Sequence, residues 1–293
     1  MTRPAPSEVP DSTGETDSRA EGPHGLEVLQ AGGGHGLGNA LFLDRAAGAL
    51  LKVYRSRRGR SEAWREALRD VGHRVFEGKR GVSPAARAAT EKETLLLWAR
   101  HGFDVPALID RPIPTEVTDP ALWIEFCPGE TLDRALSAEG SAAPAFGERI
   151  ARLAVDHARR HALALAEGEI LLVQEHPTIV HTLVSGDRLV TIDFENAYAS
   201  RTSVATAIAR ELAGTLRSFF RRLEGGESEG RAAFEAFLAA YPEREILESA
   251  VARATSGGGF AARLRRRRDR GRRNRPSKVE VMQWAGEWLA GGD

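Results

Sequence analysis

Short apolar runs separated by glycine- and aspartate-rich turns make up much of the first half of the chain. They occupy residues 26–29, 41–43, 49–54, 105–109 and 121–126. Apolar runs of this length that are bounded by Gly, Pro or Asp are typical of β-strands. The pattern therefore predicts a β-rich first half.

One longer segment between these strands carries the signals of a helix. Ser83 is a suitable N-cap, and Pro84 fits the first helical position. The segment runs to about His101 and stops at Gly102, a residue type that commonly follows a helix end. Its apolar residues at 95–98 mark the face that we expect to be buried.

The second half of the chain is dominated by helical patterns. Helices are predicted over 145–167, 204–223, 231–241, 243–255 and 279–289. Strands followed by helices indicate an α+β protein whose two kinds of element are segregated.

This order predicts a bilobal chain. We expect a disordered tail at 1–24, because it is rich in Pro, Ser, Thr, Asp and Glu. A β-rich lobe would then occupy 25–127, and a helical lobe would occupy 128–293.

The composition limits the classes of function. The chain has 293 residues and is 42% hydrophobic, which is enough for one large domain or two lobes, and its 41 basic residues balance 41 acidic ones. A single cysteine, Cys127, excludes an internal disulfide framework and fits a reducing compartment. No apolar run approaches the ~20 residues of a membrane helix. The first residues also lack the apolar core of a signal peptide, so we expect a cytoplasmic protein.

A glycine cluster lies just ahead of the strand that carries Lys52. It includes Gly34, Gly36 and Gly38. Glycine lets backbone N–H groups approach phosphates without a Cβ in the way. We expect this loop to bind phosphate, the alternative being an ordinary flexible hairpin turn.

Lys52 stands in an apolar strand, where an unpaired ammonium is costly to bury. Glu91 and Glu93, which we place near the start of the next helix, are its candidate partners. Glu91 lies one turn before Leu95 and two turns before Trp98, on the same helix face, whereas Glu93 points elsewhere. We expect Glu91 to pair with Lys52, the alternative being that both glutamates are solvated.

The segment 184–195 predicts two short strands joined by a Ser-Gly-Asp-Arg turn and ending at Asp193. An aspartate that follows an apolar strand and precedes an aromatic residue has the context of the metal-binding Asp-Phe-Gly segment of protein kinases. Phe194 supplies the aromatic residue, while Glu195 stands where kinases have the glycine.

Taken in order, these motifs resemble the bacterial lipopolysaccharide kinases, which phosphorylate Kdo or heptose sugars of the lipid A–core and belong to the protein-kinase-like superfamily. The resemblance covers about residues 26–225 and is carried by the segments 50–55, 102–106, 124–132 and 189–194. It implies a bilobal protein-kinase-like fold that uses ATP and Mg²⁺.

The resemblance also implies roles for individual residues. Lys52 would hold the α- and β-phosphates, Glu91 would orient Lys52, and Asp193 would bind magnesium. The backbone of residues 124–127, which includes Glu125 and Cys127, would receive adenine.

The chain departs from the family at the catalytic loop. Kinases place the catalytic Asp five positions before a metal-binding Asn. In this chain His181 stands at the Asn position, which resembles the heptose-kinase branch, and His176 stands five residues earlier. An alternative alignment puts Thr178 at the Asp position. In neither case does an aspartate occupy the loop.

Three interpretations of the loop stay open. His176 could accept the hydroxyl proton, because imidazole titrates near neutrality. Glu175 could do so if the loop backbone is shifted. Alternatively, the base is lost and the protein is a nucleotide-binding pseudokinase with a regulatory role. His181 and Asp193 would form the metal site, although imidazole suits softer ions than magnesium. Both histidines could also be structural hydrogen-bonding groups.

Nine arginines lie between Arg263 and Arg275. The run lacks interleaved aromatic residues, which argues against stacking on nucleic-acid bases. It would suit a phosphorylated glycolipid acceptor or an anionic membrane surface, as for an enzyme at the inner membrane. A solvated basic surface is the plain alternative.

The sequence therefore predicts an ATP-dependent phosphotransferase that acts on a hydroxyl of a sugar or lipopolysaccharide-type acceptor. The rivals are the pseudokinase and, less favoured, an arginine-rich nucleic-acid-binding protein on a kinase-derived scaffold.

Overall fold

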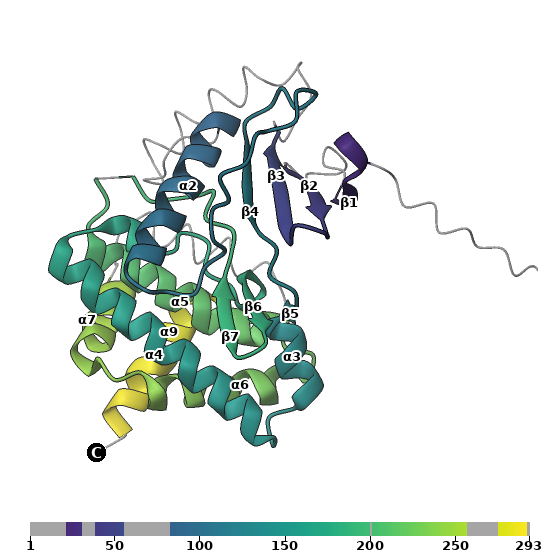
Figure 1. Ribbon diagram of the computed structural model, residues 1–293. Coiled ribbons are helices and arrows are strands. Elements are labelled where there is room, and N and C mark those ends of the chain that lie inside the picture. Colours follow the sequence, from purple (N-terminus) through teal and green to yellow (C-terminus); the bar gives the residue numbers. More distant parts are fainter. Residues whose placement is uncertain (1–21, 31–38, 56–82, 200, 257–274, 292–293) are drawn as a thin grey trace, which may run out of the picture.

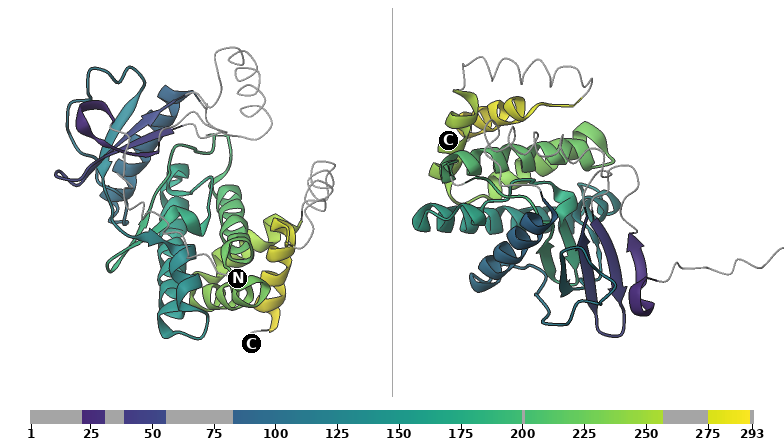
Figure 2. Two further views of the ribbon diagram at one scale, coloured as in Figure 1. Left: turned by 90° about the vertical axis from the view of Figure 1, so that its right-hand side faces the viewer. Right: turned by 90° about the horizontal axis from the view of Figure 1, so that it is seen from above.

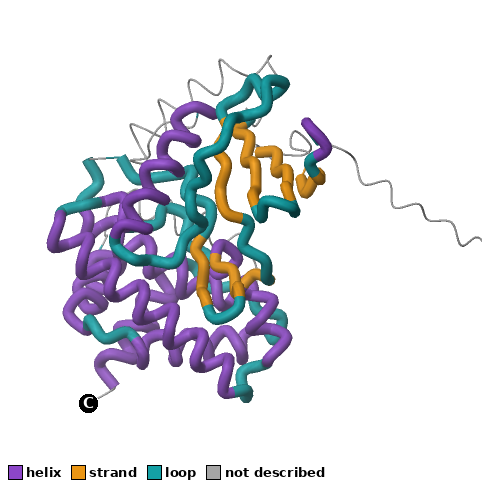
Figure 3. The backbone as a smooth tube through the Cα atoms, in the orientation of Figure 1, coloured by secondary structure: helices purple, strands orange, loops and turns teal. Residues whose placement is uncertain are grey.

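A computed structural model describes residues 22–30, 39–55, 83–199, 201–256 and 275–291. The strands β1 to β4 gather in an upper lobe, and helices make up most of the lower lobe, which also holds the strands β5 to β7 (Figures 1 and 3). The two lobes stay distinct when the molecule is turned (Figure 2). The expected α+β arrangement, a β-rich N-lobe followed by a helical C-lobe, is confirmed.

The upper lobe is built on an antiparallel sheet in which each strand pairs with the next along the chain. Its strands are β1 (Glu27–Gln30), β2 (Asn39–Asp44), β3 (Ala49–Tyr54) and β4 (Ala121–Glu125). A short 3₁₀ turn, Pro23–Gly25, precedes β1. Four of the five expected strands are present.

Strand β3 divides its side chains between the two faces of this sheet. Alternate residues of a strand point to opposite faces. Leu51 and Val53 pack with Trp123 in a small apolar cluster on one face. Lys52 and Tyr54 therefore lie on the other face, where they meet the helix that crosses the sheet.

That helix is α2 (Pro84–Arg100), and its bounds agree with the expected ones. The Ser83 side chain accepts a hydrogen bond from the backbone N–H of Ala86 at 3.3 Å, which caps the N-terminus as expected. The buried residues Arg87, Glu91 and Trp98 recur at helical spacing. They define the inner face of α2, which looks toward the sheet and the segment 192–195.

The expected strand at 105–109 is wrong. Among the described residues, this segment pairs with β4 only through an isolated bridge between Leu108 and Ile124. Pro106 has no N–H to give to a ladder. In addition, the N–H of Ala107 bonds to the Glu125 carboxylate at 3.1 Å instead of to a strand backbone. The segment therefore runs beside β4 without forming a regular strand.

A short connection, residues 126–129, leads from β4 into the lower lobe. It enters a second antiparallel sheet formed by β5 (Glu130–Thr131), β6 (Thr182–Ser185) and β7 (Arg188–Thr191). The hairpin of β6 and β7 turns at Gly186, whose φ is +57°. The two strands and the turn expected ahead of Asp193 are therefore present.

The helices of the lower lobe form one large apolar core. They are α3 (Leu132–Glu139), α4 (Pro144–Glu167), α5 (Val204–Arg222), α6 (Gly226–Ala240), α7 (Arg244–Thr255) and α9 (Lys278–Gly291). Helix α6 begins five residues earlier than the pattern predicted, because α5 ends close by and Gly230 packs against Phe220. The helix α5 lies in the middle, in contact with α4, α6, α7 and α9.

The connection between the lobes depends on Gly129, which yields a first prediction. Its φ is +145°, and a Cβ at this position would lie 2.0 Å from the carbonyl oxygen of Val184. Gly168 also has a positive φ, +68°, but open space around it. We expect Gly168→Ala to cost about 1–2 kcal/mol for its backbone conformation. Gly129→Ala should cost about 1–3 kcal/mol more, because of the added clash.

Thermal unfolding of the two variants checks this. For a chain of this size each kcal/mol lowers Tm by about 2–4 °C. Equal losses in the two variants would show that the 129 backbone moves to make room for a side chain.

Candidate active site

A cavity of about 490 Å³ lies between the two lobes. Its walls come from the sheet of the upper lobe, from helix α2, from the connection between the lobes and from the segment that follows β7. The lining residues used below are Leu41, Leu50, Lys52, Glu91, Ile124, Glu125, Phe126, Cys127, His181, Asp193 and Glu195.

Lys52 lies on the upper wall of this cavity with its charge almost fully buried. Its Nζ donates to both carboxylate oxygens of Glu91, at 2.7 and 3.0 Å, and lies 3.4 Å from Oδ1 of Asp193. Burial lowers the pKa of Lys52. The surrounding carboxylates outweigh that effect and hold the pKa above its ordinary value. The expected pairing with Glu91 is present, and Lys52 carries a stable positive charge.

Glu91 is held from a second side by Tyr54. The Tyr54 hydroxyl donates to Oε2 of Glu91 at 2.7 Å. Burial raises the pKa of Tyr54 well above its ordinary value, so the phenol stays a neutral donor. Glu93, the rejected alternative, is exposed on α2.

Asp193 has an unusual backbone conformation. Its φ is +68°, and among the described residues it is the only non-glycine residue with a positive φ. Such strain in a non-glycine residue is often found at functional sites. The conformation presents one carboxylate oxygen to Lys52 and the other to His181 Nε2, each at 3.4 Å. Its side chain keeps 29% exposure, toward the cavity.

The ring of His181 is oriented by the loop that precedes it. Nδ1 lies 3.0 Å from the backbone carbonyl oxygen of His176. A carbonyl only accepts, so Nδ1 carries the proton. In the neutral ring Nε2 would then present a lone pair to the Asp193 carboxylate. The contact is favourable when Nε2 is also protonated or when a cation lies beside both groups.

Residues 174–181 form the loop beneath the cavity, and Glu211 of helix α5 anchors its start. The carboxylate of Glu211 accepts a hydrogen bond from the backbone N–H of Gln174 at 3.0 Å. At the other end, the N–H of Ile192 donates to the carbonyl of His181 at 2.8 Å. The loop is thus tied both to the core of the lower lobe and to the residue before Asp193.

Within this loop Glu175 and His176 are adjacent but differ in exposure. The His176 side chain is 59% exposed and that of Glu175 is 6% exposed. Oε2 of Glu175 lies 3.6 Å from Nδ1 of His176. The imidazole therefore faces solvent with a buried carboxylate behind it, and neither residue lines the cavity.

The connection between the lobes forms another wall of the cavity. The Glu125 side chain is turned to Arg188, whose guanidinium donates to it at 2.9 Å. The backbone N–H of Glu125 donates to the carbonyl of Ala107 at 2.8 Å, so both the side chain and the N–H of this residue are engaged within the protein. Burial raises the pKa of the Cys127 thiol to about 11, so it is an uncharged, weakly polar group in the wall. A slot lined in this way suits a flat heterocycle.

Two sets of expected residues lie outside the described part of the chain. Gly34, Gly36 and Gly38 fall in the segment 31–38, and the arginine run 263–275 is described only at Arg275. The expected roles of both sets stay predictions.

Sequence reasoning missed the buried partners that support the site. Glu211 lies in α5 and is fully buried against Arg160, whose guanidinium binds it at 2.6 and 3.1 Å. A charged residue on an otherwise apolar helix face was the available signal in each helix. Arg87 gives the same signal on α2, one turn before Glu91.

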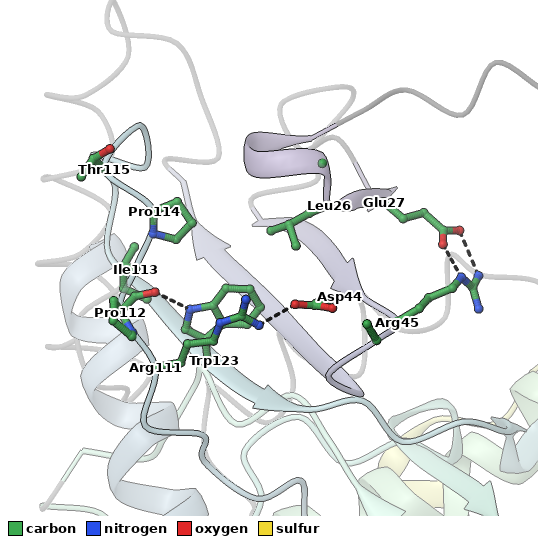
Figure 4. A pocket seen from close by; sticks show the side chains of 12 residues that line it. Leu26, Glu27, Asp44, Arg45, Arg111, Pro112, Ile113, Pro114, Thr115 and Trp123 are labelled. Carbon is green, nitrogen blue, oxygen red and sulfur yellow. Dashed lines mark hydrogen bonds and ion pairs between the residues drawn. The ribbon is translucent and has the colours of Figure 1, made fainter.

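A second cavity, of about 690 Å³, lies on the opposite side of the upper sheet (Figure 4). Trp123 lines it, and the guanidinium of Arg111 stacks over that ring at 4.5 Å. Arg111 and Arg45 form ion pairs there with Asp44 and Glu27. Its charges balance one another, and it lacks the concentration of cavity-facing charge found around Lys52.

No protein-family model matches the chain, and no curated protein matches its sequence. Solved structures align over much of its length. WaaP in complex with acyl carrier protein is 17% identical over 80% of this chain and 85% of that chain, with a TM-score of 0.38. An aminoglycoside phosphotransferase from Streptomyces rimosus is 14% identical over 78% and 91%, with a TM-score of 0.42. The Rio2 kinase from Chaetomium thermophilum is 14% identical over 73% and 67%, with a TM-score of 0.37.

A lysine on the third strand pairs with a glutamate on the following helix, a short connection joins the lobes, and an aspartate follows the last hairpin. This is the bilobal protein-kinase-like arrangement. Within the described residues, no helix has the length and apolar character needed to cross a membrane.

The charge network around Glu211 predicts a pH dependence of stability. His157 and His161 both lie beside Glu211 and Arg160. Burial and the Arg160 charge lower the pKa of His157 from 6.5 to about 3. In the unfolded chain His157 therefore binds a proton below about pH 6.5, whereas in the folded chain it stays neutral down to about pH 3. The free energy of unfolding should fall as the pH drops through this window.

Urea unfolding at pH 7, 6 and 5 checks this prediction. His157→Gln removes the titrating ring, so it should flatten the decline by up to about 1.4 kcal/mol per pH unit. If the variant keeps the slope of the parent, His157 takes up its proton in the folded state.

Proposed function

We propose that this protein is an ATP-dependent phosphotransferase that acts on a hydroxyl group of a sugar or lipopolysaccharide-type glycolipid. One observation carries the proposal. The Lys52 ammonium is held between Glu91 and Asp193 on the wall of a cavity of about 490 Å³ between the lobes. Phosphoryl transfer depends mainly on positioning and charge neutralisation, and this arrangement supplies both.

Each wall of the cavity has a role in this proposal. Lys52 contacts the phosphates, and Glu91 with Tyr54 keeps its ammonium in place. The backbone of residues 124–127 receives adenine, which would pack against Leu41 and Leu50 of the upper sheet. Gly34, Gly36 and Gly38 would close over the phosphates.

Magnesium fits the donor set around Asp193. No group of three or more His, Cys, Asp or Glu side chains that could hold a metal ion occurs among the described residues. Mg²⁺ is commonly held by one or two carboxylates together with substrate phosphates and water, so Asp193 is sufficient on the protein side. His181 would flank the ion, and the ion would neutralise phosphate charge when bound. The contact of Asp193 with Nε2 of His181 supports a cation near both groups.

His176 is the proposed proton acceptor. Its imidazole is exposed, whereas the Glu175 carboxylate lies buried behind it. This arrangement supports His176 as the base and Glu175 as the group that orients the ring. A pseudokinase is the competing function, and it is favoured by the lack of an aspartate between residues 174 and 181.

The acceptor class rests on the resemblance to the lipopolysaccharide kinases. The arginines at 263–275 would contact the phosphate groups of such an acceptor or an anionic membrane surface. The protein would then work in the cytoplasm, peripherally at the inner membrane, with nucleic acid an unlikely partner.

Binding of Mg-ATP is the first test. Mg-ATP should raise the Tm of the parent, because a ligand that binds only the folded state stabilises it. Lys52→Ala and Asp193→Asn should lose most of this increment while remaining folded. Lys92→Ala, an exposed change on α2, should keep it. Full increments in both site variants would overturn the assignment of the cavity.

Turnover of a sugar or lipopolysaccharide acceptor tests the base. His176→Ala should lower kcat by roughly 10²–10⁴-fold, the usual scale for general base catalysis. Glu175→Gln should have a smaller effect, since the ring would remain. The reverse ranking would make Glu175 the base. Binding of Mg-ATP without turnover on any such acceptor would support the pseudokinase instead.

A further inference from the structure

Glu195 occupies the position where protein kinases have glycine, and its carboxylate is buried at the edge of the cavity. Oε2 accepts a hydrogen bond from Nδ2 of Asn39 at 2.7 Å and forms a 2.8 Å ion pair with Nη1 of Arg87. The same Nη1 donates to Oδ1 of Asn39 at 2.8 Å, which closes the triangle. We call these three residues the Glu195 junction.

The junction joins separate parts of the upper lobe. Asn39 begins β2, directly after the glycine-rich segment, and Arg87 lies in the first turns of α2. Arg87 also donates through Nη2 to the backbone carbonyl of Arg55, which follows β3. The junction thus links two strands of the sheet, helix α2 and the segment that carries Asp193.

Helix α2 is linked to each of the three consecutive residues 193–195. Arg87 binds Glu195, and Trp98 packs edge-on against Phe194 with ring centroids 4.7 Å apart. Between them Glu91 reaches Asp193 through the shared Lys52 ammonium. One face of one helix therefore fixes the whole Asp-Phe-Glu sequence, and the junction forms the end nearest the start of the helix.

Charge explains why the arginine accompanies the glutamate. A buried carboxylate two residues from Asp193 would repel phosphates if nothing neutralised it. The guanidinium of Arg87 supplies that neutralisation and is itself only 1% exposed. Removing either partner would leave the other in a buried position without this ion pair.

We propose that Glu195 and Arg87 are positioning residues that hold helix α2 where Glu91 meets Lys52. In this chain the extra carboxylate replaces the freedom of a glycine with a fixed tie between the metal-binding segment and α2. The consequence for nucleotide affinity rests on the proposed function, whereas the hold on α2 does not.

Hydrogen exchange of the free protein tests the hold on α2. Glu195→Gln keeps the shape of the side chain but removes the charge that binds Arg87. Amides of α2 should exchange roughly tenfold faster in this variant, while those of α5 keep their rate. Glu93→Gln, the same chemical change at an exposed position of α2, should leave both rates as in the parent. Unchanged α2 exchange in Glu195→Gln would overturn the proposal.

A double-mutant cycle on Mg-ATP affinity tests the link to Lys52. Glu91→Gln and Glu195→Gln should each weaken binding by roughly tenfold, and the double variant by little more than either, because both act through the same pair. Losses that multiply to about a hundredfold would mean that Glu195 acts independently of Glu91, and would overturn the coupling.

The two arms separate failure of the inference from failure of the proposed function. If the parent does not bind Mg-ATP, the proposed function fails and the exchange arm still decides the hold on α2. If Glu195→Gln does not fold, Glu195→Asp retains the charge but shortens the side chain. It is then judged on the same exchange rates and the same cycle.

Discussion

The ammonium of Lys52 is a charge in a place where water cannot solvate it, and the upper lobe is arranged around that constraint. Burying an unpaired ammonium would cost several kcal/mol. Glu91 and Asp193 offset this cost, but a buried ion pair seldom improves on well-packed apolar residues for stability. The cluster is therefore better explained by a ligand than by folding, since a fixed, desolvated cation beside a cavity is what phosphates require.

Glu91 can contact Lys52 only if helix α2, which carries it, is held in the correct position. Helix α2 meets this demand with a single face, because residues at helical spacing on it contact the sheet and the Asp-Phe-Glu segment together. Tyr54 contributes from the sheet side by donating to Glu91. The strained backbone of Asp193 is held by these contacts, since a φ of +68° in an aspartate persists only when its surroundings determine it.

The parts of the site that could be predicted from the sequence are those set by local pattern. The cap at Ser83, the strand around Lys52 and the hairpin before Asp193 follow from turn residues and apolar periodicity. The segment 105–109 could not be predicted, because its pairing is decided by Pro106 and by the side chain of Glu125, eighteen residues after Ala107. The partners of Glu195 and Glu211 were also hidden, since both networks join residues that are more than thirty positions apart.

Each lobe contains a buried charge that is neutralised by its neighbours, but of these two charges only the one in the upper lobe faces a cavity. In the upper lobe a buried cation is surrounded by carboxylates and faces a cavity, whereas in the lower lobe the buried Glu211 is surrounded by Arg160 and two neutral histidines within the core. Glu211 is fully buried in the core, and its carboxylate fixes the backbone at Gln174 through a hydrogen bond. From there the loop is connected to Asp193 through the hydrogen bond between the N–H of Ile192 and the carbonyl of His181. Buried charge networks therefore hold the residues on both sides of the cavity. Relative to the kinase pattern, the chain carries different residues at 176, 181 and 195, and of these His176 is the one proposed to accept the proton.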